Sequence, residues 1–347
     1  MTIPILIALF VCIAVLPLFV RPIEQNVELF LFFMGIAAAA VAGTISPQNI
    51  AHIFENQFLY IITAAVFFIS LLFGLLENRV TSVVNFLVHH LRVRVIVFLI
   101  VVVLGLLSSI ITAIIAALLL VEMLTVLPIE RKSKVRVSVV ACFSIGLGAV
   151  LTPIGEPLAT IVTSKLHQDF LYMFHLLGVY CIVGVLLLGI LAIFLVPESW
   201  RDPSGTEGDV LPVPEKEDLR AIGVRTVKIF LFVVGLDLLG LGFKPVIDTY
   251  IIHWSNQLLY AVNMVSAILD NATLAAAEVD PVMNTVQIKA ILISLLVSGG
   301  MMVTGNIPNI VTAAKLKISM KKWAVIGLPV GVVFLIGYYL VLFVFHI

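Results

Sequence analysis

The chain has 347 residues, of which 62% are hydrophobic and only 12% are charged. Its 20 Lys and Arg residues balance its 20 Asp and Glu residues, so the formal net charge is zero. This composition argues against a basic surface for nucleic acid and indicates an all-α polytopic membrane protein whose first partner is the lipid bilayer.

Apolar runs near the roughly 20 residues that cross a bilayer predict about eight transmembrane helices. These runs cover residues 3–20, 27–45, 57–76, 136–167, 171–196, 224–242, 285–314 and 322–346. Two further apolar stretches, 95–127 and 250–280, are too long for one crossing and contain polar residues near their centres. We expect both to be re-entrant hairpins, because broken backbone at membrane depth is tolerated where protein or a water-filled cavity surrounds it.

With both hairpins returning to the side they enter, all but three of the 20 Lys and Arg residues fall on one side of the membrane. The exceptions are Lys165, Lys244 and Lys289. By the positive-inside rule the basic side is cytoplasmic. We therefore expect a multi-pass protein of the inner (plasma) membrane, with both termini outside.

The sequence repeats itself on either side of a polar segment. "LLSSIITAIIAALLL" aligns with "MVSAILDNATLAAAE", and "GAVLTPIGEPLATIV" aligns with "MMVTGNIPNIVTAA". Each unit holds an odd number of crossings, so the copies are inverted, and such a repeat with broken helices is typical of secondary transporters. The predicted organisation is two N-terminal scaffold helices in 1–56, a first repeat in 57–196 that contains the cytoplasmic-entry hairpin, a cytoplasmic linker in 197–225, and a second repeat in 226–347 that contains the exterior-entry hairpin.

Polar and acidic residues gather at the expected breaks. A charged side chain in hydrocarbon costs at least ~2.5 kcal/mol, so Asp270 and Glu156 are expected to bind a ligand there. With Asn271 they form a predicted Na⁺ site, because carboxylate, amide and carbonyl oxygens suit a hard cation. The oxygen shell is expected to include Thr152, Thr304, Asn306 and Asn309.

Other polar residues leave alternatives open. Asn306 and Asn309 could instead satisfy backbone groups freed by the broken helix. Asp237 is either a further functional acid or a residue that reaches water at a helix end, and Glu122 and Glu278 are expected to be solvated near the interfaces. Ser108 and Thr112 are possible additional ligands, because they align with Ser266 and Asp270.

The motifs "SAILDN", "TPIGEP" and "TGNIPN" resemble those of the ion transporter superfamily, which contains NhaD-type sodium/proton antiporters, arsenite permeases and sodium-coupled dicarboxylate carriers. More narrowly, the chain is similar to a group of predicted cation transporters. The resemblance implies that Ser266, Asp270 and Asn271 at a hairpin tip, with Thr152 and Glu156 in a broken helix, bind the ion. The chain departs from the NhaD-type pattern at the first hairpin, where Thr112 and Ala113 replace Asp-Asn.

We therefore expect a cation/proton antiporter, not an enzyme, that exchanges Na⁺ or Li⁺ for H⁺ by alternating access. It needs no cofactor, and a homodimer is expected. The alternative is a carrier of carboxylates or oxyanions, because the N-termini of half-helices favour negative ligands. An intramembrane aspartyl protease would need an Asp in a Gly-x-Gly-Asp setting, which neither Asp237 nor Asp270 has. A receptor or scaffold that transports nothing offers no reason for the internal repeat.

Overall fold

The computed structural model describes residues 2–24, 26–55, 59–60, 63–64, 67–68, 71, 91–166, 168–197, 219–250, 253–264 and 271–345. These residues form helices joined by loops, and they contain no β-strand. Within this part of the chain, four helices are long and apolar enough to cross a membrane: Val93–Ile111, Tyr172–Phe194, Ile222–Val246 and Met320–Val344. The all-α class and the multi-pass membrane character are thus supported.

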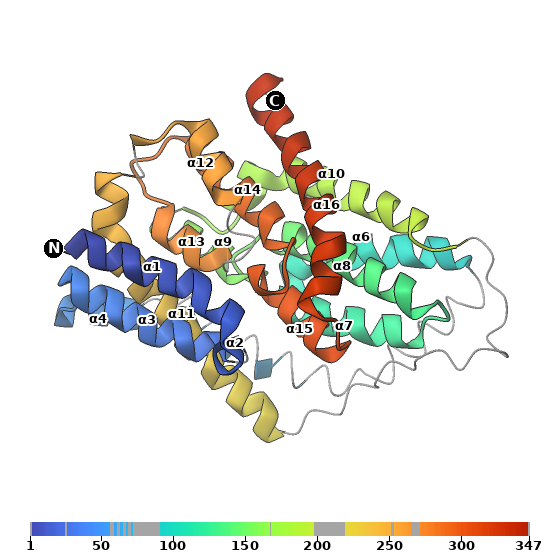
Figure 1. Cartoon of the computed structure of the whole chain (residues 1–347), viewed down its shortest axis with the longest axis horizontal. Helices are drawn as coiled ribbons and strands as arrows, with labels where there is room; N and C mark the ends of the chain where they lie inside the picture. Colours follow the sequence, from blue (N-terminus) through green and yellow to red (C-terminus); the bar gives the residue numbers. More distant parts are fainter. Residues whose placement is uncertain are drawn as a thin grey trace.

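The N-terminal helices are α1 (Thr2–Phe19), α2 (Arg21–Glu24), α3 (Val27–Ala42) and α4 (Pro47–Glu55). Helix α3 packs along α11 (Leu219–Thr249), and Figure 1 shows the two helices together on one side of the molecule. Glycines permit this close approach, because a Cβ added at Gly35 would overlap the carbonyl oxygen of Gly235. Lys228 of α11 also donates to Asn26 at the start of α3 over 2.7 Å. We refer to these two helices as the α3–α11 pair.

The segment predicted as the first repeat contains α6 (Val93–Ile111), α7 (Ala113–Val126), α8 (Arg131–Ala149), α9 (Pro157–Lys165) and α10 (Tyr172–Phe194). Helices α6 and α8 run parallel, because Ser144 donates to the carbonyl of Val101 and Thr152, farther along the chain, donates to that of Ser109. A Cβ at Gly148 would overlap the carbonyl oxygen of Gly105, so small residues bring the helices together.

Helix α7 runs back along α8. The N–H of Ala113 donates to the carbonyl of Gly155 in the loop that follows α8, while Lys134 at the start of α8 donates to the carbonyl of Thr125. The chain therefore reverses at Thr112, as expected of a hairpin. One detail differs from expectation, because the 19 residues of α6 are long and apolar enough to cross a membrane by themselves.

The second repeat contains α12 (Asn256–Asn263), α13 (Asn271–Glu278), α14 (Thr285–Gly299), a short 3-10 turn η3 (Val303–Gly305), α15 (Ile307–Lys315), α16 (Met320–Tyr339) and η4 (Leu340–Val344). The C-terminal ends of α12 and α13, the two helices of the predicted second hairpin, lie together, because the side-chain amide of Asn263 donates to Glu278 over 2.6 Å. Residues 265–270, which include Ser266 and Asp270, lie outside the described residues.

The two predicted repeats pack reciprocally. Helix α7, the returning arm of the first hairpin, lies against α15, which is the second half of the second broken helix. Helix α13, the returning arm of the second hairpin, lies against α9, the second half of the first broken helix. The first halves, α8 and α14, contact each other. The returning arm of each predicted hairpin thus packs against the second half of the other repeat's broken helix.

Candidate functional site

The first break separates α8 from α9 over residues 150–156. Pro157 opens α9, a position where proline fits because the first N–H groups of a helix have no internal partner. A Cβ at Gly155 would overlap the carbonyl oxygen of Ala149, so the turn is tight enough to require glycine. The hydroxyl of Thr160 donates to the carbonyl of Pro153 over 2.5 Å and holds the loop against α9.

The second break separates α14 from α15 over residues 300–306. The side-chain amide of Asn309 donates to the carbonyls of Gly299 and Met302 over 2.7 and 2.8 Å. It thus satisfies acceptors that the interrupted helix leaves free. Among the described residues no donor reaches the Oδ1 atom of Asn309, which is fully buried. The indole N–H of Trp323 donates to the carbonyl of Gly300 and supports the same loop.

A small cavity of about 30 Å³ lies where the first hairpin and both breaks meet. Its polar lining comes from Thr112 at the hairpin tip, Glu156 at the first break and Asn306 at the second. All three side chains are at least nine-tenths buried. Phe232 of α11 contributes an apolar wall. The volume accommodates one or two water molecules or a small ion that has lost most of its hydration shell.

Three helix N-termini also meet at this cavity. Ala113 opens α7, Pro157 opens α9 and Ile307 opens α15, and all three line it. A helix N-terminus carries a partial positive charge, which stabilises a carboxylate such as that of Glu156. The cavity therefore combines one acidic side chain with a surrounding positive potential from the backbone.

Thr112 has a backbone φ of 74°. This conformation is strained for a β-branched residue, and such strain typically collects at functional sites. The Thr112 hydroxyl oxygen is buried, and it has no hydrogen-bond partner within the described part of the chain. Strain and an unpaired hydroxyl at the cavity wall are both features that a ligand would explain.

The other predicted site residues are arranged around this cavity without lining it. Asn271 opens α13 and is buried, and its Nδ2 lies 3.4 Å from a Cβ built on Gly299, so it faces the second break. Thr304 is buried in η3. The hydroxyl of Thr152 donates to a backbone carbonyl, and that of Ser108 lies 3.0 Å from the carbonyl of Ile145, so both brace α6 against α8.

The acids outside the breaks differ from expectation. Glu122 and Glu278 are 6% and 7% exposed, so the prediction that they are solvated is wrong. The cause is the reciprocal packing, which covers both returning arms of the hairpins with the opposite repeat. Burial raises the pKa of Glu278 to about 7, although its hydrogen bond from Asn263 acts in the opposite direction. Asp237 lies partly buried on α11.

Sequence reasoning missed Asn263, which is buried and joins the arms of the second hairpin. A signal was present, because Asn263 and Glu278 are placed almost symmetrically in the sequence about Asp270, the predicted tip. In an antiparallel hairpin, residues at equal distances from the tip face each other.

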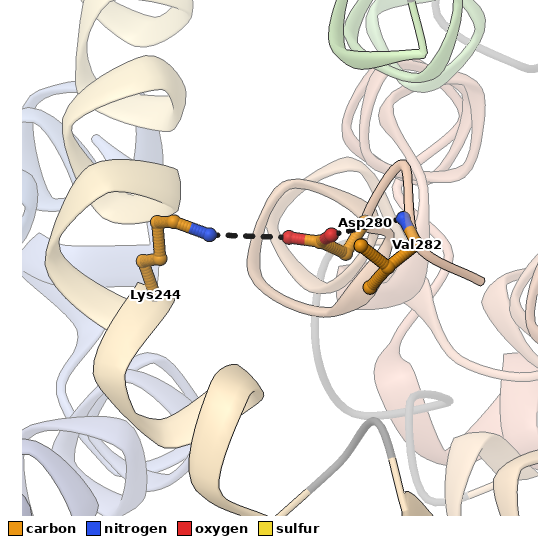
Figure 2. A network of polar contacts seen from close by, with 3 residues as sticks. All are labelled: Lys244, Asp280 and Val282. Carbon is orange, nitrogen blue, oxygen red and sulfur yellow. Dashed lines mark hydrogen bonds and ion pairs between the residues drawn. The ribbon is translucent and has the colours of Figure 1, made fainter.

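Figure 2 shows an ion pair that joins α11 to the segment after α13. The Nζ atom of Lys244 lies 3.3 Å from the carboxylate of Asp280, and the other oxygen of Asp280 accepts the N–H of Val282. The Lys244 side chain is about half exposed, whereas that of Asp280 is 9% exposed. The pair thus links the α3–α11 pair to the second hairpin.

Comparison with known families adds one result. The sequence profile of a family described as "Protein of unknown function (DUF1646)" matches residues 3–345. The chain belongs to that family. The DUF1646 match covers both repeats, both breaks and the linker, so the cavity lies within the part that defines the family. No curated protein matches the chain.

Proposed function

We propose that this DUF1646 protein is a secondary active transporter that exchanges a monovalent cation, Na⁺ or Li⁺, for protons by alternating access. The observation that carries the proposal is the buried cavity where a hairpin tip and both helix breaks meet around Glu156. Breaks at the meeting point of two repeats are where secondary transporters bind their substrates.

The ligands at the cavity favour a hard cation. Glu156 supplies a carboxylate, Thr112 a hydroxyl oxygen and Asn306 an amide oxygen, and all three are oxygen donors of the kind that Na⁺ prefers. We propose that the second hairpin tip completes the shell through Asp270, Asn271 and Ser266, with support from Thr152, Thr304 and Asn309. Because a carboxylate accepts either a proton or a cation, the same group can exchange one for the other.

Alternating access requires one part of the protein to move against another. We propose that the two hairpins and broken helices move together, because their arms interlock reciprocally. The α3–α11 pair would then be the stationary scaffold, and its exposed apolar face a surface for a homodimer. Asp237 would contribute to a proton pathway, because it lies on the same helix as Phe232 of the cavity wall.

The membrane orientation is part of the proposal. Three basic residues donate hydrogen bonds at helix ends. Lys228 donates at the start of α3, Lys134 donates at the end of α7, and Arg94 donates just after the end of α10. We propose that these ends face the cytoplasm of the inner (plasma) membrane and that both termini lie outside.

A second candidate is an anion carrier, and one observation favours it. The N-termini of α7, α9 and α15 all meet at the cavity, and they would stabilise a carboxylate or oxyanion. The buried Glu156 opposes this candidate, because its negative charge would repel an anionic substrate. Protonation of Glu156 would be needed before an anion could enter.

Reconstitution in liposomes separates the two candidates. A Na⁺ gradient imposed on vesicles containing the purified protein should change the internal pH, whereas gradients of dicarboxylate, phosphate or arsenite should not. Asp270→Asn should abolish the exchange while the protein remains folded in the membrane, because the substitution keeps the shape and removes the charge. An anion-driven flux without a response to Na⁺ or Li⁺ would reject the antiporter.

A further inference from the structure

The arms of the second hairpin are joined by a polar contact that lies apart from the cavity. Asn263 ends α12 and Glu278 ends α13, and their side chains are 2% and 7% exposed. The amide nitrogen of Asn263 donates to Oε2 of Glu278 over 2.6 Å. The hydroxyl oxygen of Ser298 in α14 lies 3.0 Å from the backbone carbonyl oxygen of Asn263 and 2.5 Å from that of Ser294, so a third helix packs closely against the same point.

The orientation of the Asn263 amide follows from its two acceptors. Its Nδ2 atom lies 3.0 Å from the carbonyl oxygen of Leu259 as well as 2.6 Å from the Glu278 carboxylate. Rotating the amide by half a turn would set its oxygen against the carbonyl oxygen of Leu259, which is an acceptor whatever the charge of Glu278, so the nitrogen must be on this side. Both N–H groups of the amide are then used. Its oxygen is buried, and no donor among the described residues reaches it.

An ionised carboxylate cannot supply the missing donor, because it carries only acceptors. A neutral carboxylic acid can supply it. Such an acid pairs with a primary amide through two complementary hydrogen bonds: the acid C=O accepts an amide N–H, and the acid O–H donates to the amide oxygen. The first of these bonds is present between Asn263 and Glu278.

We propose that the Glu278 carboxyl group is protonated and that its O–H donates a hydrogen bond to Oδ1 of Asn263. The pair is then a proton-dependent clasp between the two arms of the second hairpin. Loss of the proton removes one of the two hydrogen bonds. It also leaves a buried negative charge near an amide oxygen that has no donor, so the arms are released. The proposal does not depend on which ion the protein transports.

The helices around α13 carry several charged residues, which bear on the titration of Glu278. Helix α13 packs against α9, α11 and α14; α9 carries Lys165, α14 carries Lys289, and the second half of α11 carries Asp237, Lys244 and Asp248. Lys244 pairs with Asp280, and Lys289 donates to the hydroxyl of Tyr180 over 3.3 Å. Tyr260 of α12 donates to the carbonyl of Leu335. No lysine or arginine in the described structure forms an ion pair with Glu278.

The direction of the pH effect follows from burial, which raises the pKa of Glu278 above its ordinary value to about 7. A carboxyl group with a raised pKa in the folded state favours that state when protonated. The clasp is therefore complete in acid and is lost as the pH rises through about 7.

Infrared difference spectroscopy on the full-length protein in lipid nanodiscs tests whether the Glu278 carboxyl group carries a proton. The wild type should show a neutral carboxylic C=O band that disappears as the pH rises through about 7. Glu278→Gln should lack this band, and Glu156→Gln should retain it. The proposal would be overturned if this pH-dependent band persisted in Glu278→Gln, or if the wild type showed no such band in this pH range.

Hydrogen exchange tests the clasp itself, with rates corrected for the intrinsic effect of pH. Protection of residues 256–280 should fall severalfold in the wild type across the same pH range. Glu278→Gln should stay protected throughout, because a glutamine amide offers a C=O and an N–H in the same arrangement as a protonated acid. Asn263→Leu should be weakly protected at every pH. Wild-type protection that is independent of pH, or that is restored at alkaline pH by Na⁺, would show that no proton forms the clasp.

Discussion

The backbone N–H of Ala113 donates to the carbonyl oxygen of Gly155 over 2.7 Å and fastens the tip of the first hairpin to the break of the first broken helix. Thr112 precedes Ala113, and Glu156 follows Gly155. This one backbone bond therefore sets the two cavity side chains beside each other. The geometry of the cavity depends on a loop-to-loop contact and not on a continuous helix.

Thr112→Gly should stabilise the protein and impair its exchange activity. Glycine adopts a positive φ without strain, and relief of such strain in a non-glycine residue contributes about 1–3 kcal/mol, less the larger backbone entropy of glycine when unfolded. The melting temperature in detergent should rise, while cation exchange falls because the hydroxyl is lost. Thr112→Ser is the matched control, since it keeps both the hydroxyl and the strain. A lower melting temperature for the glycine variant than for the serine variant would contradict the assignment of backbone strain to Thr112.

Several features of this site were predictable because they depend on local chemistry. Proline and glycine disfavour a continuous helix, so Gly155 and Pro157 indicated the first break, although the same pair at Gly327 and Pro329 lies inside the unbroken helix α16. The repeat between "TPIGEP" and "TGNIPN" then indicated that the breaks correspond. Long-range packing was not predictable in the same way. Glu278 was expected at an interface, and only the contact of α13 with α9 explains its burial.

Asn309 illustrates the same limit. The sequence left open whether its amide binds an ion or satisfies backbone groups, since both roles suit an asparagine in a broken helix. The structure shows that its nitrogen bonds to two carbonyls and that its oxygen remains available. Asp270, the acid that the sequence singled out most strongly, lies outside the described residues, and its role stays a prediction.

Asn306 and Asn309 should respond differently to substitution by alanine. Asn309→Ala leaves two buried carbonyls without their donor, and each unsatisfied group costs about 1–3 kcal/mol, so this variant should melt well below the wild type. Asn306 lines the cavity and makes no capping hydrogen bond to α15, so Asn306→Ala should melt near the wild type. Its Na⁺ affinity should instead be reduced. Equal loss of stability in both variants would remove the distinction between a structural and a ligand-binding asparagine.

Movement of the hairpins against the α3–α11 pair should be blocked by cross-linking. Lys244 and Asp280 join these parts, so a short bifunctional thiol reagent acting on Lys244→Cys with Asp280→Cys should arrest exchange. Asn26→Cys with Lys228→Cys is the matched control, because both residues belong to the α3–α11 pair. Full transport by the cross-linked first pair would exclude motion at this boundary.

The proposed orientation predicts which cysteines are accessible from outside. Val282 is 68% exposed just before α14, and Lys317 is exposed just after α15, at the opposite end of the same broken helix. In intact cells an impermeant thiol reagent should label Val282→Cys and leave Lys317→Cys unlabelled until the membrane is permeabilised. The reverse pattern would invert the topology.

The central claim is that a proton and a cation compete for one site that includes Glu156. Equilibrium binding of radioactive Na⁺ to the purified protein, measured as a function of pH, tests it most directly. If one proton competes, the apparent affinity should rise by about tenfold for each pH unit over the range in which the site is protonated, and Glu156→Gln should bind Na⁺ more weakly with a flatter pH dependence. Na⁺ binding that does not change with pH, or that is the same in Glu156→Gln as in the wild type, would contradict the account.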